Sequence, residues 1–464
     1  MKIRFRRFLV ITLISLLPLA VLVRAKNTGL VTNPPTQSNS VPSFGGNAQH
    51  TSVYQPAAQT LNQIRWTTTI DLNPGDLAHY GSPLVTAANT VFVPVKTATD
   101  GFRVDVFDGN TNGVLKYTLT TDYVLPSHSW VPVYNPCLTT GPFGTRLYYA
   151  GRGGTLYYID NPDSVAHGTP VHEVFYTTLA NYLANAAAYN ASIFINTPFT
   201  ADSKGNVFFG FRVSGTAPAP ISSSQSGFAR IDPNGNGTYI LAGAASNDGG
   251  INRDSHNSAP ALSNDESLVY VMAKNSMTGH GYLLALDSTT LAPRHRVFVQ
   301  DPRNDNPAVI SDDSTASPMV APDGDVYIGV LSNPGNGSRG FLLRFSGDLS
   351  VEKTPGAFGW DYTAAIVPSS MVPSYQGTST YLIFSKYNNY AGFGDGDGVN
   401  RIMVRRQRRE CDVRPRLGRG DDARHHRGGF GGVLADTGLS REHERVRAFD
   451  DGGRHVRDFG ARRP

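Results

Sequence analysis

Residues 314–346 read STASPMVAPDGDVYIGVLSNPGNGSRGFLLRFS and predict three short β-strands separated by turns. A Ser-Pro pair leads into the apolar residues 319–320, and the Pro-Asp-Gly turn at 322–324 leads into the second strand at 326–329. After a loop rich in Gly, Asn and Ser, residues 341–345 form a third apolar run. β-Branched and aromatic residues that alternate between turn clusters are typical of strands. The stretch therefore predicts one antiparallel β-sheet unit.

The same unit recurs along the chain with a period of fifty to sixty-two residues. A fixed period of three or four short strands is the signature of a β-propeller, whose blades stack around an axis to bury their faces. We therefore predict an all-β propeller over residues 44–402 with six visible units, and seven or eight blades in an intact form. A β-sandwich or a β-solenoid is the alternative. The prolines that lead the units are Pro83, Pro136, Pro198, Pro260 and Pro318, with Pro368 as a looser sixth.

Composition agrees with this fold class. The 464 residues include 48 Gly, 30 Pro, 21 Tyr and 23 Phe, and they show no long amphipathic helical pattern. Such a chain is turn-rich, aromatic-rich and long enough to bury a sizeable core. Only Cys137 and Cys411 are present, so the fold must depend on packing rather than on a disulfide framework.

The first 25 residues have the order of a signal peptide. Basic residues precede the apolar run Phe8–Val23, and small or short residues end at Ala25. The run has sixteen residues and contains Pro18, whereas a membrane span needs about twenty residues. We predict cleavage after Ala25 and a secreted or periplasmic product without a stable membrane span; an N-terminally anchored extracytoplasmic protein is the alternative. Residues 26–43 are polar and rich in Pro, Ser and Asn, which is typical of a flexible linker.

Residues 403–464 differ from the rest of the chain. They contain sixteen Arg but no Lys, Tyr, Ile or Asn, and the change falls inside the third strand of the sixth unit. An Arg-rich extension that binds nucleic acid is one interpretation. A frameshift in a GC-rich gene is the other, and we favour it because a natural extension would begin after a finished blade. We therefore predict that this tail is disordered and lies outside the ring.

The charge follows the same division. Residues 1–402 hold 25 basic and 27 acidic side chains, whereas residues 403–464 hold 16 basic and 10 acidic ones. The net charge of +4 thus comes from the tail, and the propeller itself is mildly acidic. A mildly acidic domain has no electrostatic attraction for nucleic acid, so we expect no nucleic-acid partner.

Several motifs resemble those of the quinoprotein-dehydrogenase-like propellers, also called PQQ-repeat-like propellers. Residues 44–50 (FGGNAQH) and 61–66 (LNQIRW) resemble the opening segment of that family, in which a lone strand with a Trp pairs into the last blade and closes the ring. The runs 326–329 (VYIG) and 281–287 (GYLLALD) resemble its blade repeat. The resemblance covers residues 44–402, and its motifs specify a blade rather than a reaction.

The catalytic members of that family bind the quinone PQQ and a calcium ion, which the resemblance implies here only as an alternative. This chain has no adjacent cysteines, and Trp66, Trp130 and Trp360 match no cofactor platform. Asp395 and Asp397 lie in a DGDG run that resembles half of a calcium loop, although a hairpin turn explains the same run. We therefore expect no cofactor and no metal site.

A ligand site is expected at the mouth of the channel. If the Pro-led strand is the innermost strand of each blade, the residues before it lie in loops that converge on one face, where binding residues are commonly found. Aromatic rings there offer stacking surfaces, while Arg and Asp orient a ligand. The alternative is that a buried Asp254–His256 pair ties one blade to the next. The predicted contacts are His79, His128, Trp130, Arg253, Asp254, His256, Trp360 and Asp361.

These observations predict an exported, monomeric propeller that acts as a rigid binding or scaffolding module. Its partner at the mouth would be a small molecule, a glycan or a protein. A PQQ-dependent oxidoreductase and a purely structural module of the cell envelope are the two alternatives.

Overall fold

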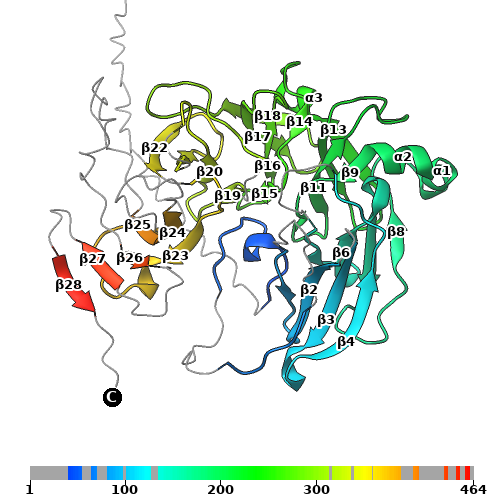
Figure 1. Ribbon diagram of the computed structural model, residues 1–464, viewed down its shortest axis with the longest axis horizontal. Coiled ribbons are helices and arrows are strands. Elements are labelled where there is room, and N and C mark those ends of the chain that lie inside the picture. Colours follow the sequence, from blue (N-terminus) through cyan, green and yellow to red (C-terminus); the bar gives the residue numbers. More distant parts are fainter. Residues whose placement is uncertain are drawn as a thin grey trace, which may run out of the picture.

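The computed structural model describes residues 40–54, 64–70, 81–97, 101–126, 134–312, 316–335, 339–357 and 359–387, together with the backbone of four short strands between residues 401 and 459 (Figure 1). This part of the chain forms six antiparallel sheets of four to six strands. The sheets follow one another around a common centre, so the predicted β-propeller is confirmed (Figure 1). None of the helices in the described ranges is long and apolar enough to cross a membrane.

Each blade is built from strands that are consecutive in sequence. The first two blades consist of β1 (Leu84–Val85), β2 (Thr90–Lys96), β3 (Phe102–Asp108) and β4 (Val114–Thr120), then β5 (Cys137–Gly141), β6 (Gly144–Ala150), β7 (Leu156–Asp160) and β8 (Val171–Glu173). The third consists of β10 (Thr200–Ala201), β11 (Val207–Val213), β12 (Gly227–Ile231) and β13 (Gly237–Leu241), with β9 (Ile193–Ile195) also paired to β11.

The remaining blades follow the same plan. The fourth and fifth consist of β14 (Arg253–Asp254), β15 (Ala261–Leu262), β16 (Leu268–Lys274), β17 (Gly281–Asp287) and β18 (Pro293–Phe298), then β19 (Met319–Val320), β20 (Val326–Val330), β21 (Phe341–Phe345) and β22 (Glu352–Ala357). The sixth begins with β23 (Ala365–Pro368), β24 (Tyr381–Tyr387) and β25 (Arg401–Arg406). Two short helices, α1 (Leu179–Ala184) and α2 (Ala186–Ser192), lie between β8 of the second blade and β9 of the third. A third, α3 (Ala242–Ser246), lies between β13 of the third blade and β14 of the fourth.

The repeat in the sequence reappears as a repeat in strand register. The inner strand of a blade pairs with the second residue of the apolar run in the next strand, as in Leu84 opposite Phe92 and Met319 opposite Tyr327. In five blades a proline lies one or two residues before that inner strand. The sixth blade departs from the prediction, because Pro368 ends β23 and pairs with Tyr381 rather than leading the strand. Proline donates no N–H to a ladder, so a strand end is a position that tolerates it.

Hydroxyl groups join neighbouring blades at the rim where the first strand turns into the second. The Tyr270 hydroxyl donates to the carbonyl of Gly347 at 2.7 Å, which joins the fourth and fifth blades. The hydroxyls of Tyr327 and Tyr381 lie 3.1 Å apart and join the fifth and sixth. These contacts are neutral, and burial raises the pKa of each of the three tyrosines.

The N-terminal segment lies in the centre of the ring and does not pair into the last blade. Residues 40–54 form a turn with the short 3₁₀ helix Phe44–Gly46, and this segment is drawn in blue between the blades (Figure 1). Residues 64–70 contain no strand, and Trp66 lies against Gly113 of the first blade. The predicted closure by a lone strand at 44–66 is therefore incorrect for the described residues. We call residues 41–51 the hub.

The tail also differs in part from the expectation. Strand β25 runs across the predicted boundary at residue 402, and β26 (Val433–Asp436), β27 (Val446–Phe449) and β28 (His455–Phe459) extend the sixth sheet outward, as Figure 1 shows. They lie outside the ring, as predicted, but they are regular strands. The outer edge of a sheet offers unpaired backbone groups, and short apolar runs such as Val433–Ala435 can pair with such an edge.

Candidate functional site

The strand directions place the predicted mouth at the rim where inner strands begin and second strands end. His79, His128, Trp130, Asp395 and Asp397 lie outside the described residues. The structure brings Arg253, Asp254 and His256 into one cluster of charged and polar side chains, which we call the mouth cluster. Its other members are Asn196, Arg212, Lys274 and Asp312.

Strand pairing sets the positions of the cations. Strand β14 pairs with the end of β16, so that Arg253 lies directly opposite Lys274. Arg212 occupies the matching position near the end of β11, opposite Phe194. Like charges on directly opposed residues repel each other. The cluster therefore needs an acidic group beside Arg253 and Lys274.

Asp312 supplies that group. Its carboxylate lies 2.7 Å from the Lys274 ammonium and 3.6 Å from the Arg253 guanidinium. Burial of Asp312 opposes its ionisation, but the attraction and hydrogen bond of Lys274 outweigh that effect, so the pKa of Asp312 is lowered. Lys274 also donates to the carbonyl of Ile310 at 2.9 Å. Asp312 is therefore an ionised carboxylate held between the fourth and fifth blades.

Asn196 connects Asp254 with His256, two of the predicted ligand contacts. Its amide nitrogen donates to Asp254 Oδ2 at 2.9 Å, and its amide oxygen accepts from His256 Nδ1 at 2.8 Å. The backbone N–H of His256 donates to Asp312 Oδ1 at 3.1 Å. Asp254 and His256 are thus linked through Asn196, and the three bonds join the third, fourth and fifth blades. The predicted inter-blade tie is present, with an amide at its centre.

Asp254 is the most unusual group in the cluster. Its side chain is fully buried, and its Oδ1 atom accepts no hydrogen bond from the described part of the chain. Burial raises the pKa of Asp254 to about 7, against the opposing effects of the Asn196 hydrogen bond and of the nearby Arg212 and Arg253. Burial and the charge of Arg253 together lower the pKa of Arg212. The carboxyl of Asp254 thus changes its charge near neutral pH.

Trp360 and Asp361 belong to the sixth blade rather than to the mouth cluster. Asp361 pairs with Lys386 at 3.1 Å, and Lys386 lies near the end of β24. Trp360 packs beside Gly340 of the fifth blade, where a side chain at Gly340 would meet the Trp360 Cβ at 2.6 Å. The pair Lys386–Asp361 repeats the pair Lys274–Asp312, with a strand-end lysine facing an acidic residue of a mouth loop.

Arg212 and Lys274 were not predicted, although the sequence carries a signal for them. Counted from the first residue of the apolar run in each second strand, the sixth residue is basic in five of the six blades: VFVPVK, LYYAGR, VFFGFR, VYVMAK and YLIFSK. The fifth blade has VYIGVL instead. In four blades this residue lies at or near the mouth end of the second strand, so the repeat itself places a set of cations at this rim: Lys96, Arg212, Lys274 and Lys386. Arg152 lies just beyond the end of β6, in the 3₁₀ helix Arg152–Gly154.

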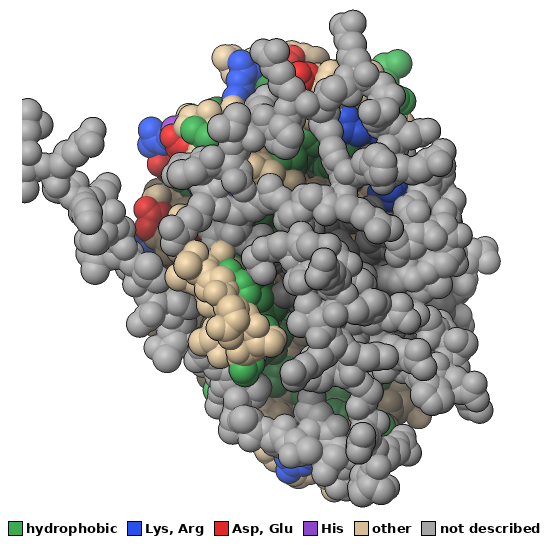
Figure 2. Space-filling model, turned by 90° about the vertical axis from the view of Figure 1, so that its left-hand side faces the viewer, with side chains coloured by type: hydrophobic (Ala, Val, Ile, Leu, Met, Phe, Trp, Pro, Cys, Tyr) green, Lys and Arg blue, Asp and Glu red, His purple; other side chains and the backbone are tan. Residues whose placement is uncertain are grey.

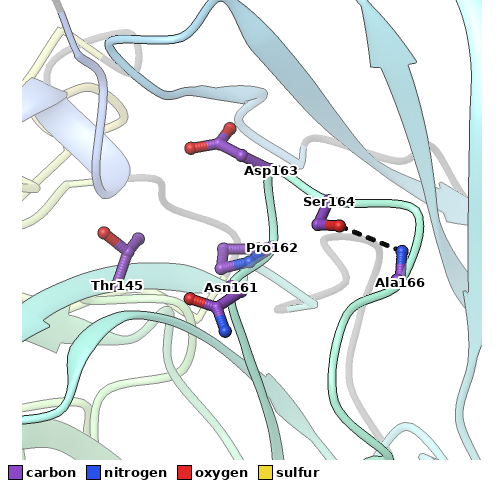
Figure 3. Close-up of a pocket in the computed structure, with 6 residues that line it drawn as sticks. All are labelled: Thr145, Asn161, Pro162, Asp163, Ser164 and Ala166. Carbon is purple, nitrogen blue, oxygen red and sulfur yellow. Dashed lines mark hydrogen bonds between the residues drawn. The ribbon is translucent and has the colours of Figure 1, made fainter.

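Two hollows accompany these features. One, of about 460 Å³, lies at the mouth between the hub and the first and sixth blades, and is lined by Phe44, Tyr54, Pro83 and Tyr362 among others. The other, of about 580 Å³, lies at the opposite rim beside Asp163 (Figure 3). Asp163 accepts from Thr86 of the first blade at 2.5 Å, so its position is explained by the junction of two blades.

The described residues offer no ready metal site. Calcium takes six to eight oxygen ligands, and within the described ranges no three His, Cys, Asp or Glu side chains are grouped so as to hold a metal ion. The Lys and Arg side chains that are coloured on the face beside the sixth blade are scattered rather than gathered into one patch (Figure 2).

Comparison with known proteins finds similarity of fold only. No family model matches the chain, and no curated protein matches it. Among solved structures, the Dos1 propeller is similar at a TM-score of 0.37 and 11% identity, over 69% of this chain and 64% of that one. The calcium-binding protein regucalcin from Agrobacterium tumefaciens is similar at a TM-score of 0.33 and 11% identity, over 74% of this chain and 86% of that one. A quinoprotein alcohol dehydrogenase-like protein from Bacteroides thetaiotaomicron is similar at a TM-score of 0.33 and 14% identity, over 58% of this chain and 53% of that one.

The chain spans less than two thirds of the length of the Dos1 propeller. These similarities indicate neither a site nor an activity for this chain. The class of the protein, a β-propeller, is defined by its own six sheets.

Proposed function

We propose that this propeller is a rigid binding module whose ligand occupies the mouth cluster, and that the ligand is a small molecule or glycan with an acidic group. The observation that carries the proposal is Asp254, a fully buried carboxyl with one oxygen that accepts no hydrogen bond from the described residues. Burying an ionisable group without full hydrogen bonding is costly. Such perturbed groups are common at functional sites.

The balance of charge supports an acidic ligand. Three cations, Arg212, Arg253 and Lys274, surround two carboxyl groups, and Asp254 is only partly ionised near neutral pH because its pKa is about 7. The cluster is therefore net positive. Arg253 and Asp312 keep about a quarter of their side chains exposed, so a ligand can approach the cluster from solvent. A guanidinium binds carboxylate or phosphate oxygens in a forked geometry.

The test is a thermal-shift titration with named probes: D-glucose, D-glucuronate, citrate and inorganic phosphate. A ligand that binds only the folded chain at one hundred times its Kd stabilises it by about 2.7 kcal/mol. We expect an acidic probe to raise the Tm of the unsubstituted protein. Arg253→Ala should lose that shift, whereas Arg294→Ala should keep it. Arg294 lies on outer strand β18, pairs with Asp287 at 2.8 Å and is half exposed.

Each outcome decides between classes. A shift that persists in Arg253→Ala places the ligand elsewhere, and a shift with D-glucose alone contradicts the acidic ligand but not the binding module. No shift with any probe favours the structural module of the cell envelope. Dye reduction that depends on added PQQ and calcium would favour the oxidoreductase.

We also propose that the chain is exported, with cleavage after Ala25. The basic, apolar and small residues at the N-terminus support this proposal. N-terminal sequencing of the mature protein should begin at Lys26, and an intact Met1 in the mature product would contradict export with cleavage.

A further inference from the structure

The inner strands of the blades share a backbone donor that faces the centre of the ring. It is the N–H of the second residue of the inner strand, and in five blades it donates to a carbonyl of the hub. The bonds run from Val85 to Val41 (3.1 Å), Leu138 to Pro42 (2.7 Å), Leu262 to Ala48 (2.8 Å), Val320 to Gln49 (2.9 Å) and Ile366 to Thr51 (2.8 Å). Buried N–H groups need partners, and the hub provides them.

The hub residues contact the blades in chain order. Residues 41, 42, 48, 49 and 51 bond to the first, second, fourth, fifth and sixth blades in turn. The third blade is reached by a side chain, because His50 Nε2 lies 3.2 Å from Thr200 Oγ1. His50 Nδ1 also lies 2.8 Å from the carbonyl of Pro318 in the fifth blade. The hub thus contacts every blade of the described ring.

The hub has a specific backbone conformation that is held by hydrogen bonds within the N-terminal segment. Gly45 and Gly46 adopt φ of 67° and 82°, and His50 and Ser52 adopt positive φ although they carry side chains. The N–H of Ser52 donates to the carbonyl of Gly45 at 2.7 Å, and the Asn47 side chain accepts from the N–H of Thr51 at 3.0 Å. Positive φ in a residue with a side chain persists only where the surroundings impose it.

We propose that the inner edges of the blades form a peptide-binding site and that residues 41–51 are its ligand, carried by the chain itself. The hub closes the ring in place of a strand shared between the first and last blades. All strands of the first blade come from residues 84–120 and all described strands of the sixth from residues 365–459, so within the described chain these blades share no strand. Val41 and Thr51 join those two blades through the centre.

This binding mode is backbone recognition by strand edges. Main-chain hydrogen bonds supply affinity, and side chains in pockets supply specificity. Here the specific side chain is His50, which is fully buried. A hub that behaves as a ligand should remain bound after the chain between it and the first blade is cut.

The test cuts the full-length chain at a site for a sequence-specific protease inserted between residues 55 and 63. Size-exclusion chromatography with mass spectrometry then follows the N-terminal fragment. We expect the fragment to co-elute with the body, and a labelled peptide of residues 40–54 in excess to exchange into the cleaved protein. Separation of the fragment from a body with unchanged Tm would overturn the proposal, as would failure of the peptide to exchange while the fragment is slowly lost.

Two glycine variants provide a matched pair. At Gly45 an added Cβ would lie 2.7 Å from the Cα of His50, whereas at Gly144 of the second blade, with φ of 84°, it would meet nothing within 4 Å. Alanine at either position is therefore strained by the positive φ. Only Gly45→Ala also clashes with His50 and so disturbs the hub. Loss of the cleaved fragment in Gly45→Ala and retention in Gly144→Ala support the site. Equal retention in both variants contradicts it. The cleaved unsubstituted protein keeps the test decisive if Gly45→Ala does not fold.

Discussion

The hub and the mouth cluster both join neighbouring blades, but they do so with different chemistry. The hub uses backbone carbonyls and a histidine whose pKa is lowered to about 4 by burial, so it is neutral at physiological pH. The mouth cluster uses three cations and two carboxyl groups. The hub thus contacts all six blades through neutral groups, whereas the mouth cluster places charged groups between the third, fourth and fifth blades.

The hub and the mouth cluster also differ in how much their contacts contribute to the free energy of unfolding. A hydrogen bond between neutral backbone groups contributes about 1 kcal/mol to the free energy of unfolding. A buried charge stabilises the fold only if the interactions with its partners outweigh its loss of hydration. Asp254 lacks a full set of partners among the described residues. We therefore expect the hub to determine stability and the mouth cluster to determine binding.

The largest effect is expected from His50→Ala. The substitution removes the contacts to Thr200 and to Pro318 and leaves a cavity at the centre of the ring. We expect the free energy of unfolding to fall by about 3–4 kcal/mol, measured by denaturant titration. The control is His295→Ala on the exposed outer strand β18, with an expected change below about 0.5 kcal/mol. Equal effects would show that the hub is not a determinant of stability.

The pH dependence of stability provides a second test of the hub. The pKa of His50 is about 4 in the folded chain and 6.5 when unfolded, so the unfolded state binds more protons between these values. The contribution of neutral His50 to the free energy of unfolding is therefore fully present above pH 6.5. It falls by about 3 kcal/mol as the pH is lowered toward 4. This loss should be absent from the stability–pH curve of His50→Ala. An unchanged slope in that variant would assign the pH dependence to other groups.

Asp254→Asn should act in the opposite direction. The folded-state pKa of about 7 lies above the ordinary value of 3.8, so the folded state holds a proton that the unfolded state has lost, and the carboxyl destabilises the fold increasingly as pH rises from 3.8 to 7. We expect the variant to gain about 1–3 kcal/mol at pH 8 and little at pH 4. Lower stability at pH 8 would show that the Asp254 carboxylate is a structural requirement.

The smallest effect on stability is expected at Arg253. Its guanidinium is partly exposed and lies 3.6 Å from Asp312, so Arg253→Ala should change the free energy of unfolding by less than about 1 kcal/mol. Lys274→Ala is the matched comparison, because Lys274 is nearly fully buried and bonds to Asp312 and to Ile310. Breaking that pair should cost more. A large loss in Arg253→Ala would make it a structural residue like Lys274.

The sequence predicted the blades because each is a local object. Short apolar runs, turn residues and a regular period lie within about sixty residues of one another, so their pairing can be inferred from spacing. Pro368 was misplaced because a proline is compatible with either end of a strand. The strands beyond residue 402 were not expected because composition, rather than pairing with an available edge, decided that prediction.

The mouth cluster was predicted in part. Arg253, Asp254 and His256 were identified from the loop position that the repeat gives them, and they do lie together. Arg212 and Lys274 were missed because they stand at the ends of strands, where a basic residue also fits an ordinary solvated terminus. Only the register of β14 against β16 brings Arg253 opposite Lys274.

The sequence by itself therefore determined the repeating sheets and the face on which polar loops gather, since both depend on local pattern and period. Tertiary structure alone decided how the centre is filled. The contact of His50 with Pro318 joins residues 268 positions apart, and no local pattern encodes such a bond. A backbone carbonyl has the same chemistry in every residue, so its partner is fixed only when the ring assembles around it.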